Sequence, residues 1–209
     1  MSAIAAYRTS ILALLADAGK VVFSDNDVDQ ALRWALSEYS YHRPLIRTYQ
    51  YSVIGSTATH ELPADFVTRE IVKVELFNAN PDQVIELEQY SDRPDEQWII
   101  HTKNTIANAQ VLTVYYSVVH QVDGLDSAAG TTVPTDDEIL LELGAAGHAA
   151  LMRATNRAET INMNPGVVDA YRALALDYTA RFSVLLSVQG GPRTGLPDFP
   201  GDHPTTLEF

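Results

Sequence analysis

The sequence predicts an α+β protein in which helices at both ends of the chain enclose a β-rich middle. Two observations predict this class. Apolar residues recur every three or four positions before Pro44 and again after Val133, which is the spacing of amphipathic helices. Between these segments the pattern changes to short alternating runs rich in β-branched and aromatic residues, which is typical of strands. We therefore expect one small helical bundle with an inserted antiparallel β-sandwich or barrel and an extended C-terminal tail.

Residues 1–44 are expected to form two helices. The first is expected to end at Gly19, because glycine commonly follows a helix C-terminus. The second is expected to begin after Ser24, which is placed to cap it with Asp27 near its positive end, and to stop at Pro44. Their apolar stripes are Ile4, Tyr7, Ile11, Leu14 and Leu15 in the first helix, and Val28, Ala31, Leu32, Ala35, Leu36 and Tyr39 in the second.

Residues 45–132 are expected to form the inserted β-rich domain. Gly55-Ser56 marks a turn after the first strand, and Glu61-Leu62-Pro63 has the composition of a strand end entering a loop. Short turn-bounded runs of this kind, five or six in all, favour an antiparallel sandwich or small barrel. The expected strand segments are 49–53, 71–76, 84–87, 98–100 and 111–116.

Residues 133–188 are expected to form two further helices that join the first pair. Thr135 and Glu138 have the spacing of a capping box, and Asn164-Pro165 places a capping residue before a proline at the first helical position. The last helix carries one apolar stripe: Val168, Tyr171, Leu174, Ala175, Tyr178, Phe182 and Leu185.

One face of the helix that follows Thr135 consists of small residues and lets another helix approach closely. The sequence leaves two interpretations open, burial of this face within the chain or a contact between subunits. The candidate contact residues are Gly144, Ala145, Gly147 and Ala150.

Residues 189–209 are rich in glycine and proline and cannot sustain a helix or a central strand. They are interpreted either as a disordered terminus or as an extended docking arm, since proline lowers the entropy cost of fixing such a segment. The candidate partner-binding residues are Leu196, Pro197, Phe199, Pro200, Leu207 and Phe209.

The charge balance narrows the classes of partner. The 209 residues carry a net charge of −13, which argues against a surface built to grip nucleic acid or anionic lipid. Residues 61–96 hold ten of the acidic side chains, either as a solvated β surface or as the rim of an assembly past which DNA slides. There is no cysteine and no apolar run long enough to span a membrane, so we expect neither disulfides nor a membrane segment.

The sequence shows no motif for catalysis, a metal or a cofactor. Asp25, Asp27 and Asp29 resemble the start of a calcium loop, but Gln30 stands at the turn glycine and Leu36 at the bidentate glutamate. The six histidines are scattered without ligand spacing, and neither a nucleophile elbow nor a phosphate-binding loop is present. We expect a protein that is not an enzyme and that needs no cofactor.

The chain resembles the head-to-tail adaptor (neck or connector) proteins of tailed bacteriophages over about residues 24–155. The order of the expected elements carries part of the resemblance: two N-terminal helices, a β-rich insert, two further helices and an extended tail. The local features that carry it are Glu38-Tyr39-Ser40, Glu61-Leu62-Pro63, Val72-Lys73-Val74-Glu75, Tyr116 with His120, and Thr132-Val133-Pro134 leading to Glu138, Leu141 and Gly144-Ala145.

The resemblance implies a structural ring, commonly of twelve copies, beneath the portal of a DNA-filled head. In such adaptors the helical part packs into the ring, the C-terminal arm grips the portal, and the far side receives the next neck or tail protein. The chain would then act in the virion neck after assembly in the host cytoplasm, with DNA passing through without specific binding. The long β insert departs from the simplest all-helical members.

Two other functions remain open at this point. A tail-completion or terminator ring is a second structural role, although such proteins are usually less helical at their ends. The inserted domain is alternatively a binding module for a sugar or peptide, through aromatics such as Trp98, Tyr115 and Tyr116, although aromatics in strands are more often core residues.

Overall fold

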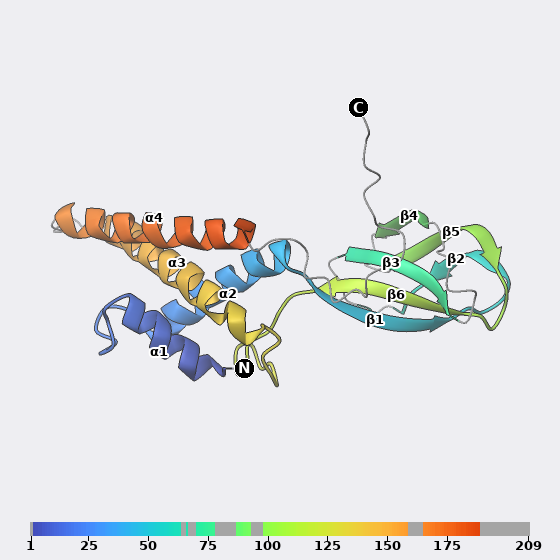
Figure 1. Cartoon of the computed structure of the whole chain (residues 1–209), viewed down its shortest axis with the longest axis horizontal. Coiled ribbons are helices and arrows are strands. Elements are labelled where there is room, and N and C mark those ends of the chain that lie inside the picture. The colour runs from blue at the N-terminus through green and yellow to red at the C-terminus, as the bar shows by residue number, and fades with distance from the viewer. Residues whose placement is uncertain are drawn as a thin grey trace, which may run out of the picture. The chain divides into compact units, whose positions relative to one another are not determined.

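A computed structural model gives the fold of the chain (Figure 1). It describes residues 2–63, 66, 70–77, 87–92, 98–158 and 165–188. These residues form four α-helices, a short 3₁₀ helix and two three-stranded antiparallel sheets, so the predicted α+β class is confirmed. Among the described strands neither sheet closes into a barrel. The chain divides into a helical unit, made of the described residues up to Pro44 and from Val119 onward, and a β unit, Leu45–Val118.

Helix α1 (Ile4–Leu14) ends earlier than predicted. Ala16 adopts a left-handed conformation (φ 53°) in place of the expected Gly19. The Asp17 carboxylate then accepts hydrogen bonds from three successive backbone N–H groups at 2.9, 2.8 and 2.8 Å, those of Val21, Val22 and Phe23. A carboxylate therefore fixes the loop between the first two helices, and the prediction that the helix ends at Gly19 was wrong.

Helix α2 (Asp25–His42) begins as predicted. The Ser24 hydroxyl accepts a hydrogen bond from the N–H of Asp27 at 3.2 Å, and the Asp27 carboxylate accepts the N–H of Ser24 at 2.9 Å. This reciprocal capping box satisfies two backbone groups at the helix N-terminus.

The second helical pair is entered differently from the prediction. A 3₁₀ turn, η1 (Thr135–Asp137), precedes α3 (Glu138–Ala158), and the Thr135 side chain makes no capping hydrogen bond. The Glu138 carboxylate instead accepts the N–H and the hydroxyl of Ser2, both at 2.8 Å, so the capping box predicted here is not formed. Helix α4 (Pro165–Val188) does begin at the predicted proline.

Side chains of all four helices meet in one hydrophobic core, and so do residues that the sequence assigned to the β domain. Val122 and Leu125 are buried in this core, and the backbone of Asp123 pairs with Ala3 beside the start of α1. The β unit therefore ends at Val118, and the boundary predicted at residue 132 was too late.

The β unit contains two antiparallel sheets. One has the order β1 (Leu45–Ser52), β6 (Val111–Val118), β3 (Glu70–Phe77); the other has the order β2 (Thr57–Glu61), β5 (Trp98–Ile106), β4 (Leu87–Asp92). Both sheets contribute to one core that includes Val74, Ile100 and Leu112. Of the predicted strand at 84–87, the residues before Leu87 lie outside the described part.

Candidate interaction surfaces

The predicted docking arm lies outside the described residues. This applies to each of its candidate binding residues: Leu196, Pro197, Phe199, Pro200, Leu207 and Phe209. Their assignment to a partner stays a prediction.

The small residues of α3 are buried within the chain, and its two glycines lie against α4. Ala145 and Ala150 are fully buried. A Cβ atom on Gly144 would lie 3.1 Å from the Phe182 ring, and one on Gly147 would lie 2.8 Å from Cγ2 of Thr179. The face therefore serves packing within the chain, and the alternative assignment of these four residues to a subunit contact is corrected.

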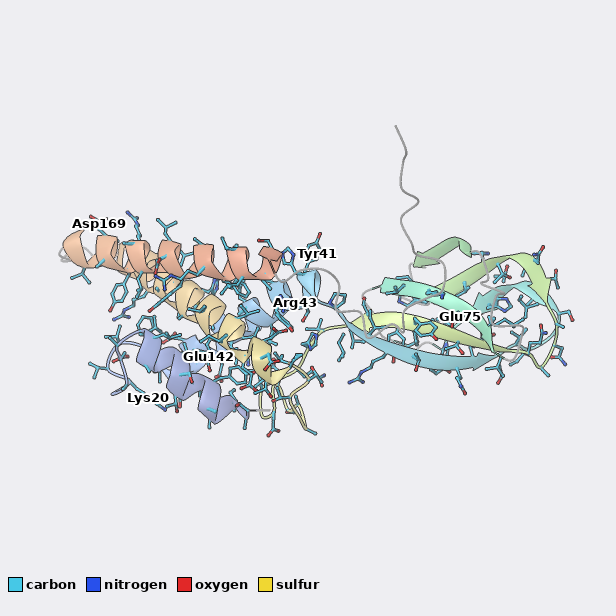
Figure 2. The ribbon with its side chains drawn as sticks, viewed as in Figure 1. Lys20, Tyr41, Arg43, Glu75, Glu142 and Asp169 are labelled. Atoms are coloured by element: carbon cyan, nitrogen blue, oxygen red, sulfur yellow. The ribbon has the colours of Figure 1, made fainter. Side chains whose placement is uncertain are left out.

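A buried ionic network lies where the chain leaves the helical unit. Arg43 follows the last residue of α2 (Figure 2), and its Nη1 donates to Oδ2 of Asp137 at 2.8 Å. The Tyr39 hydroxyl donates to the same oxygen at 2.7 Å. The Arg43 and Asp137 side chains are only 6% and 2% exposed. Such a pair is strongly destabilised when one partner is removed, since the other charge stays in a desolvated site.

His120 ties the returning chain to the same helix end. Its backbone N–H donates to the Ser40 hydroxyl at 3.0 Å, and its ring Nε2 lies 3.1 Å from the Arg43 carbonyl oxygen. Its Nδ1 lies 3.1 Å from the Thr132 hydroxyl and 3.2 Å from the Thr132 carbonyl oxygen. The residues next to Pro44 and Val119 are thus fastened to one another within the helical unit.

The electrostatics of this network follow from its burial. Burial, together with the hydrogen bond to Asp137, raises the pKa of the Tyr39 hydroxyl. Burial lowers the pKa of His120, against the opposing effect of the carbonyl oxygens of Thr132 and Arg43. These groups are enclosed and engaged with one another, so the network is suited to holding the chain rather than to acting on a substrate.

The sequence alone does not predict this network. Arg43 and Asp137 are 94 positions apart. Each is a charged residue near a helix end, and nothing in its local sequence indicates that the two side chains pair. Of the residues around this network, His120 and Thr132 were named only among the features that carry the family resemblance, in Tyr116 with His120 and in Thr132-Val133-Pro134.

A groove of about 320 Å³ lies beside α2 in the helical unit. Buried Leu36, Val122 and Leu125 contribute apolar surface to it. Among its lining residues the Arg33 guanidinium forms a bidentate pair with Asp126, with Nε donating to Oδ2 at 2.9 Å and Nη2 donating to Oδ1 at 2.7 Å. The volume is at the lower end of the range for ligand sites, and its lining gives no constellation for a reaction.

The three aspartates at the start of α2 are engaged in local contacts. Asp29 accepts two hydrogen bonds from Arg8 at 2.8 and 2.7 Å, Asp25 pairs with Lys20 at 2.7 Å, and Asp27 closes the capping box. Their assignment to helix N-terminal charge, rather than to a calcium loop, agrees with these contacts. Among the described residues no three His, Asp or Glu side chains are grouped to hold a metal ion.

The aromatic residues considered for a binding module are partly buried. Trp98 and Tyr116 pack against the β core, and the Tyr116 ring lies 4.7 Å from that of Phe66. The Tyr115 hydroxyl donates to Glu75 of β3 at 2.8 Å (Glu75 is labelled in Figure 2). Two of the three rings thus serve the core, which weakens the case for an aromatic ligand platform.

No described helix combines the length and the apolar composition needed to cross a membrane. Comparison with known proteins adds no family: no protein-family model matches the chain, and no curated protein matches it significantly.

Proposed function

We propose that the chain is a structural subunit of a bacteriophage neck, an oligomeric ring adaptor that joins the portal to the next neck or tail protein and surrounds the DNA channel. One observation carries the proposal. The helical pairs α1–α2 and α3–α4 share one core although the whole β unit is inserted between them, and this is the order on which the resemblance rests.

Two further features support a mechanical rather than a catalytic role. The links on either side of the β unit are fastened to the helical unit by buried contacts of Arg43 and His120, which suits a subunit that holds two partners. The net charge of −13 suits a channel wall, because DNA is repelled from an acidic surface rather than bound by it.

In this proposal the four helices act as a bundle within the ring and the two sheets as a small sandwich. The ring contact lies elsewhere than the small residues of α3, since these are buried within the chain. The C-terminal arm, with Leu196, Phe199 and Phe209 among its apolar residues, grips the portal. The subunit acts without a cofactor in the virion neck, after assembly in the host cytoplasm.

A tail-completion ring is the second structural candidate. The long α3 and α4 helices, of 21 and 24 residues, favour the adaptor, because terminator-type rings are usually less helical. Both roles need an assembled ring, and the partner that the ring binds distinguishes them.

The proposal is tested by mixing the full chain with portal-containing phage particles and measuring co-sedimentation. We expect binding, and we expect it to be lost in a chain that ends at Val188. In the full-length chain, Phe199→Ser with Phe209→Ser is expected to weaken binding, whereas the matched control Thr194→Ser with Thr205→Ser is expected to keep it. Absence of binding by the full chain contradicts the proposal. Binding that survives truncation overturns the role of the arm.

A further inference from the structure

The edge strands of the two sheets differ in how they are protected from pairing with another chain. Proteins commonly blunt sheet edges with charges and β-bulges. Of the four strands that form sheet edges in the described part of the chain, β2, β3 and β4 show a break in register against their neighbour. Strand β3 also carries Glu70, Lys73 and Glu75, and β4 carries Glu88 and Asp92.

Strand β1 lacks these features. It pairs with β6 in unbroken register from Leu45 to Ser52, and Arg47 is its only charged residue. In the part of the chain that the structure describes, β6 is its only neighbouring strand (Figure 1). An edge strand turns the N–H and C=O of every second residue away from its sheet, so β1 presents a regular row of donors and acceptors.

The chain segments that contain most of β1 and its neighbour β6 carry no formal charge, although Glu61 lies close enough to Tyr51 to add to the effect of burial in raising its pKa. Residues 48–60 and 104–122 contain no Asp, Glu, Lys or Arg, in a chain with a net charge of −13. Thr48, Gln50 and Ser52 are exposed on β1, and Ile54 at the following turn is 83% exposed. Two acidic molecules therefore meet less local repulsion between like charges at β1 than at the charged strands β3 and β4.

We propose that β1 pairs antiparallel with β1 of a second copy of the chain, so that their three-stranded sheets join into one six-stranded sheet. The pairing goes beyond the neck assignment and does not depend on it. Among the described strands it uses the one edge that is both regular and nearly uncharged, and it satisfies the outward backbone groups of both copies at once.

The register of such a pair is restricted by the core. Tyr49 and Tyr51 pack toward the β core, and residues directly opposite each other across an antiparallel pair point to the same face. A two-fold pair that keeps the core faces together is therefore centred on a residue rather than between two residues, and centring it on Tyr49 or on Thr48 pairs the largest part of the eight-residue strand. Arg47 then lies opposite Tyr51 or Tyr49 of the other copy, a favourable cation–π arrangement, and does not face its own counterpart.

The test is charge substitution on the exposed face of β1, read by sedimentation of the full chain over a range of concentrations. The wild type is expected to dimerise. Thr48→Lys with Gln50→Lys puts lysines opposite lysines in both registers and is expected to weaken dimerisation about tenfold. Thr48→Glu with Gln50→Glu is expected to do the same. An equimolar mixture of the two variants is expected to restore the dimer.

Two controls locate the contact. Ser183→Lys with Ser187→Lys adds the same charge to exposed positions of α4 and is expected to leave dimerisation unchanged. Amide hydrogen exchange is expected to show new protection at alternate residues of β1 on dimerisation, and thermal melts check that each variant is folded.

A wild type that stays monomeric at every concentration overturns the proposal. So does a dimer that the lysine substitutions on β1 do not weaken. A monomer whose β1 amides become protected only when an unrelated extended peptide is added also overturns it, because the occupant is then not a second copy.

Discussion

The helical unit and the β unit differ in whether the surfaces that could bind another segment are covered within the fold. In the helical unit, α4 lies against the two glycines of α3, and the Asp17 carboxylate accepts hydrogen bonds from three N–H groups of the α1–α2 loop. In the β unit, β1 remains a regular and nearly uncharged edge within the described chain. The small residues of α3, which the sequence offers as a candidate subunit contact, are thus buried inside the fold. Strand β1, which the sequence does not single out, keeps backbone groups that can pair with another strand.

The two units also differ in how they bury polar groups. The helical unit buries a charged pair with a tyrosine on the same carboxylate oxygen. The β unit buries His60, which is 0% exposed, with Nε2 at 3.5 Å from the Thr102 hydroxyl and no partner for Nδ1 among the described residues. We therefore expect a few specific contacts to decide the stability of the helical unit, and apolar packing to decide that of the β unit.

The two tryptophans allow this contrast to be measured, because Trp34 lies in the helical unit and Trp98 in the β unit. Trp98→Phe leaves fluorescence that reports on the helical unit, and Trp34→Phe leaves fluorescence that reports on the β unit. Each substitution below is to be made in both backgrounds, since two units can unfold in separate steps.

Asp137→Ala is expected to have the largest effect. It removes the carboxylate that binds both Arg43 and Tyr39 and should lower the free energy of unfolding by about 3–5 kcal/mol. Urea unfolding followed by Trp34 should show the loss, with a much smaller change at Trp98. Arg43→Met with Asp137→Leu should recover most of it, because no charge is then left buried. An equal loss at both reporters would contradict the contrast between the units.

Gly147→Ala is expected to cost about 1–3 kcal/mol, because the new methyl group would lie 2.8 Å from Cγ2 and 3.0 Å from the backbone N of Thr179. Alanine normally stabilises an exposed helix relative to glycine, so the sign of the effect reports the contact with α4. Gly130→Ala is the matched control, since its Cβ meets nothing within 4 Å. A stabilised Gly147→Ala variant would show that α4 does not lie against this face.

Ser24→Ala is expected to cost about 1 kcal/mol through loss of the cap on α2. The Trp34 reporter should register this loss. If the Trp98 reporter registered it equally, the two units would unfold as one.

Acidification is expected to give a gradual loss of stability that begins just below pH 6.5 and is small near neutrality. Burial lowers the pKa of His60, His120 and His148 from the ordinary value of 6.5. Well above pH 6.5 the folded and unfolded states both hold neutral rings. As the pH falls through 6.5 the unfolded state binds protons first, so the free energy of unfolding falls with pH.

His60→Gln tests the part of this pH dependence that belongs to the β unit. It should flatten the decline at the Trp98 reporter and leave the decline at Trp34 unchanged, because His120 and His148 both lie in the helical unit. Stability that rises on acidification over this range would contradict the burial of the neutral rings.

The sequence predicted the features that depend on local periodicity. The amphipathic stripe after Ser24 gave α2 and its cap, and Asn164-Pro165 gave the start of α4. Predictions failed where a side chain that the local pattern does not indicate made the deciding hydrogen bonds. Ser2 takes the Glu138 carboxylate that the capping box required, and Asp17 organises a loop in which Gly19 was expected to end the helix.

The candidate sites were harder to predict than the fold. Small residues at 144–150 indicate close helix packing, but the spacing does not tell whether the neighbouring helix belongs to the same chain or to another. The Arg43–Asp137 pair and the open edge of β1 depend on contacts between segments far apart in the sequence, which periodicity does not encode. The distribution of charged residues distinguishes β1 from the other edge strands only when the order of the strands in each sheet is known.

The most direct test of the neck assignment is electron cryomicroscopy of portal-containing particles incubated with the full chain. The account predicts a closed ring of added density directly beneath the portal. It also predicts that this density is missing when the chain ends at Val188. Particles whose portal region is unchanged by the full chain would contradict the assignment.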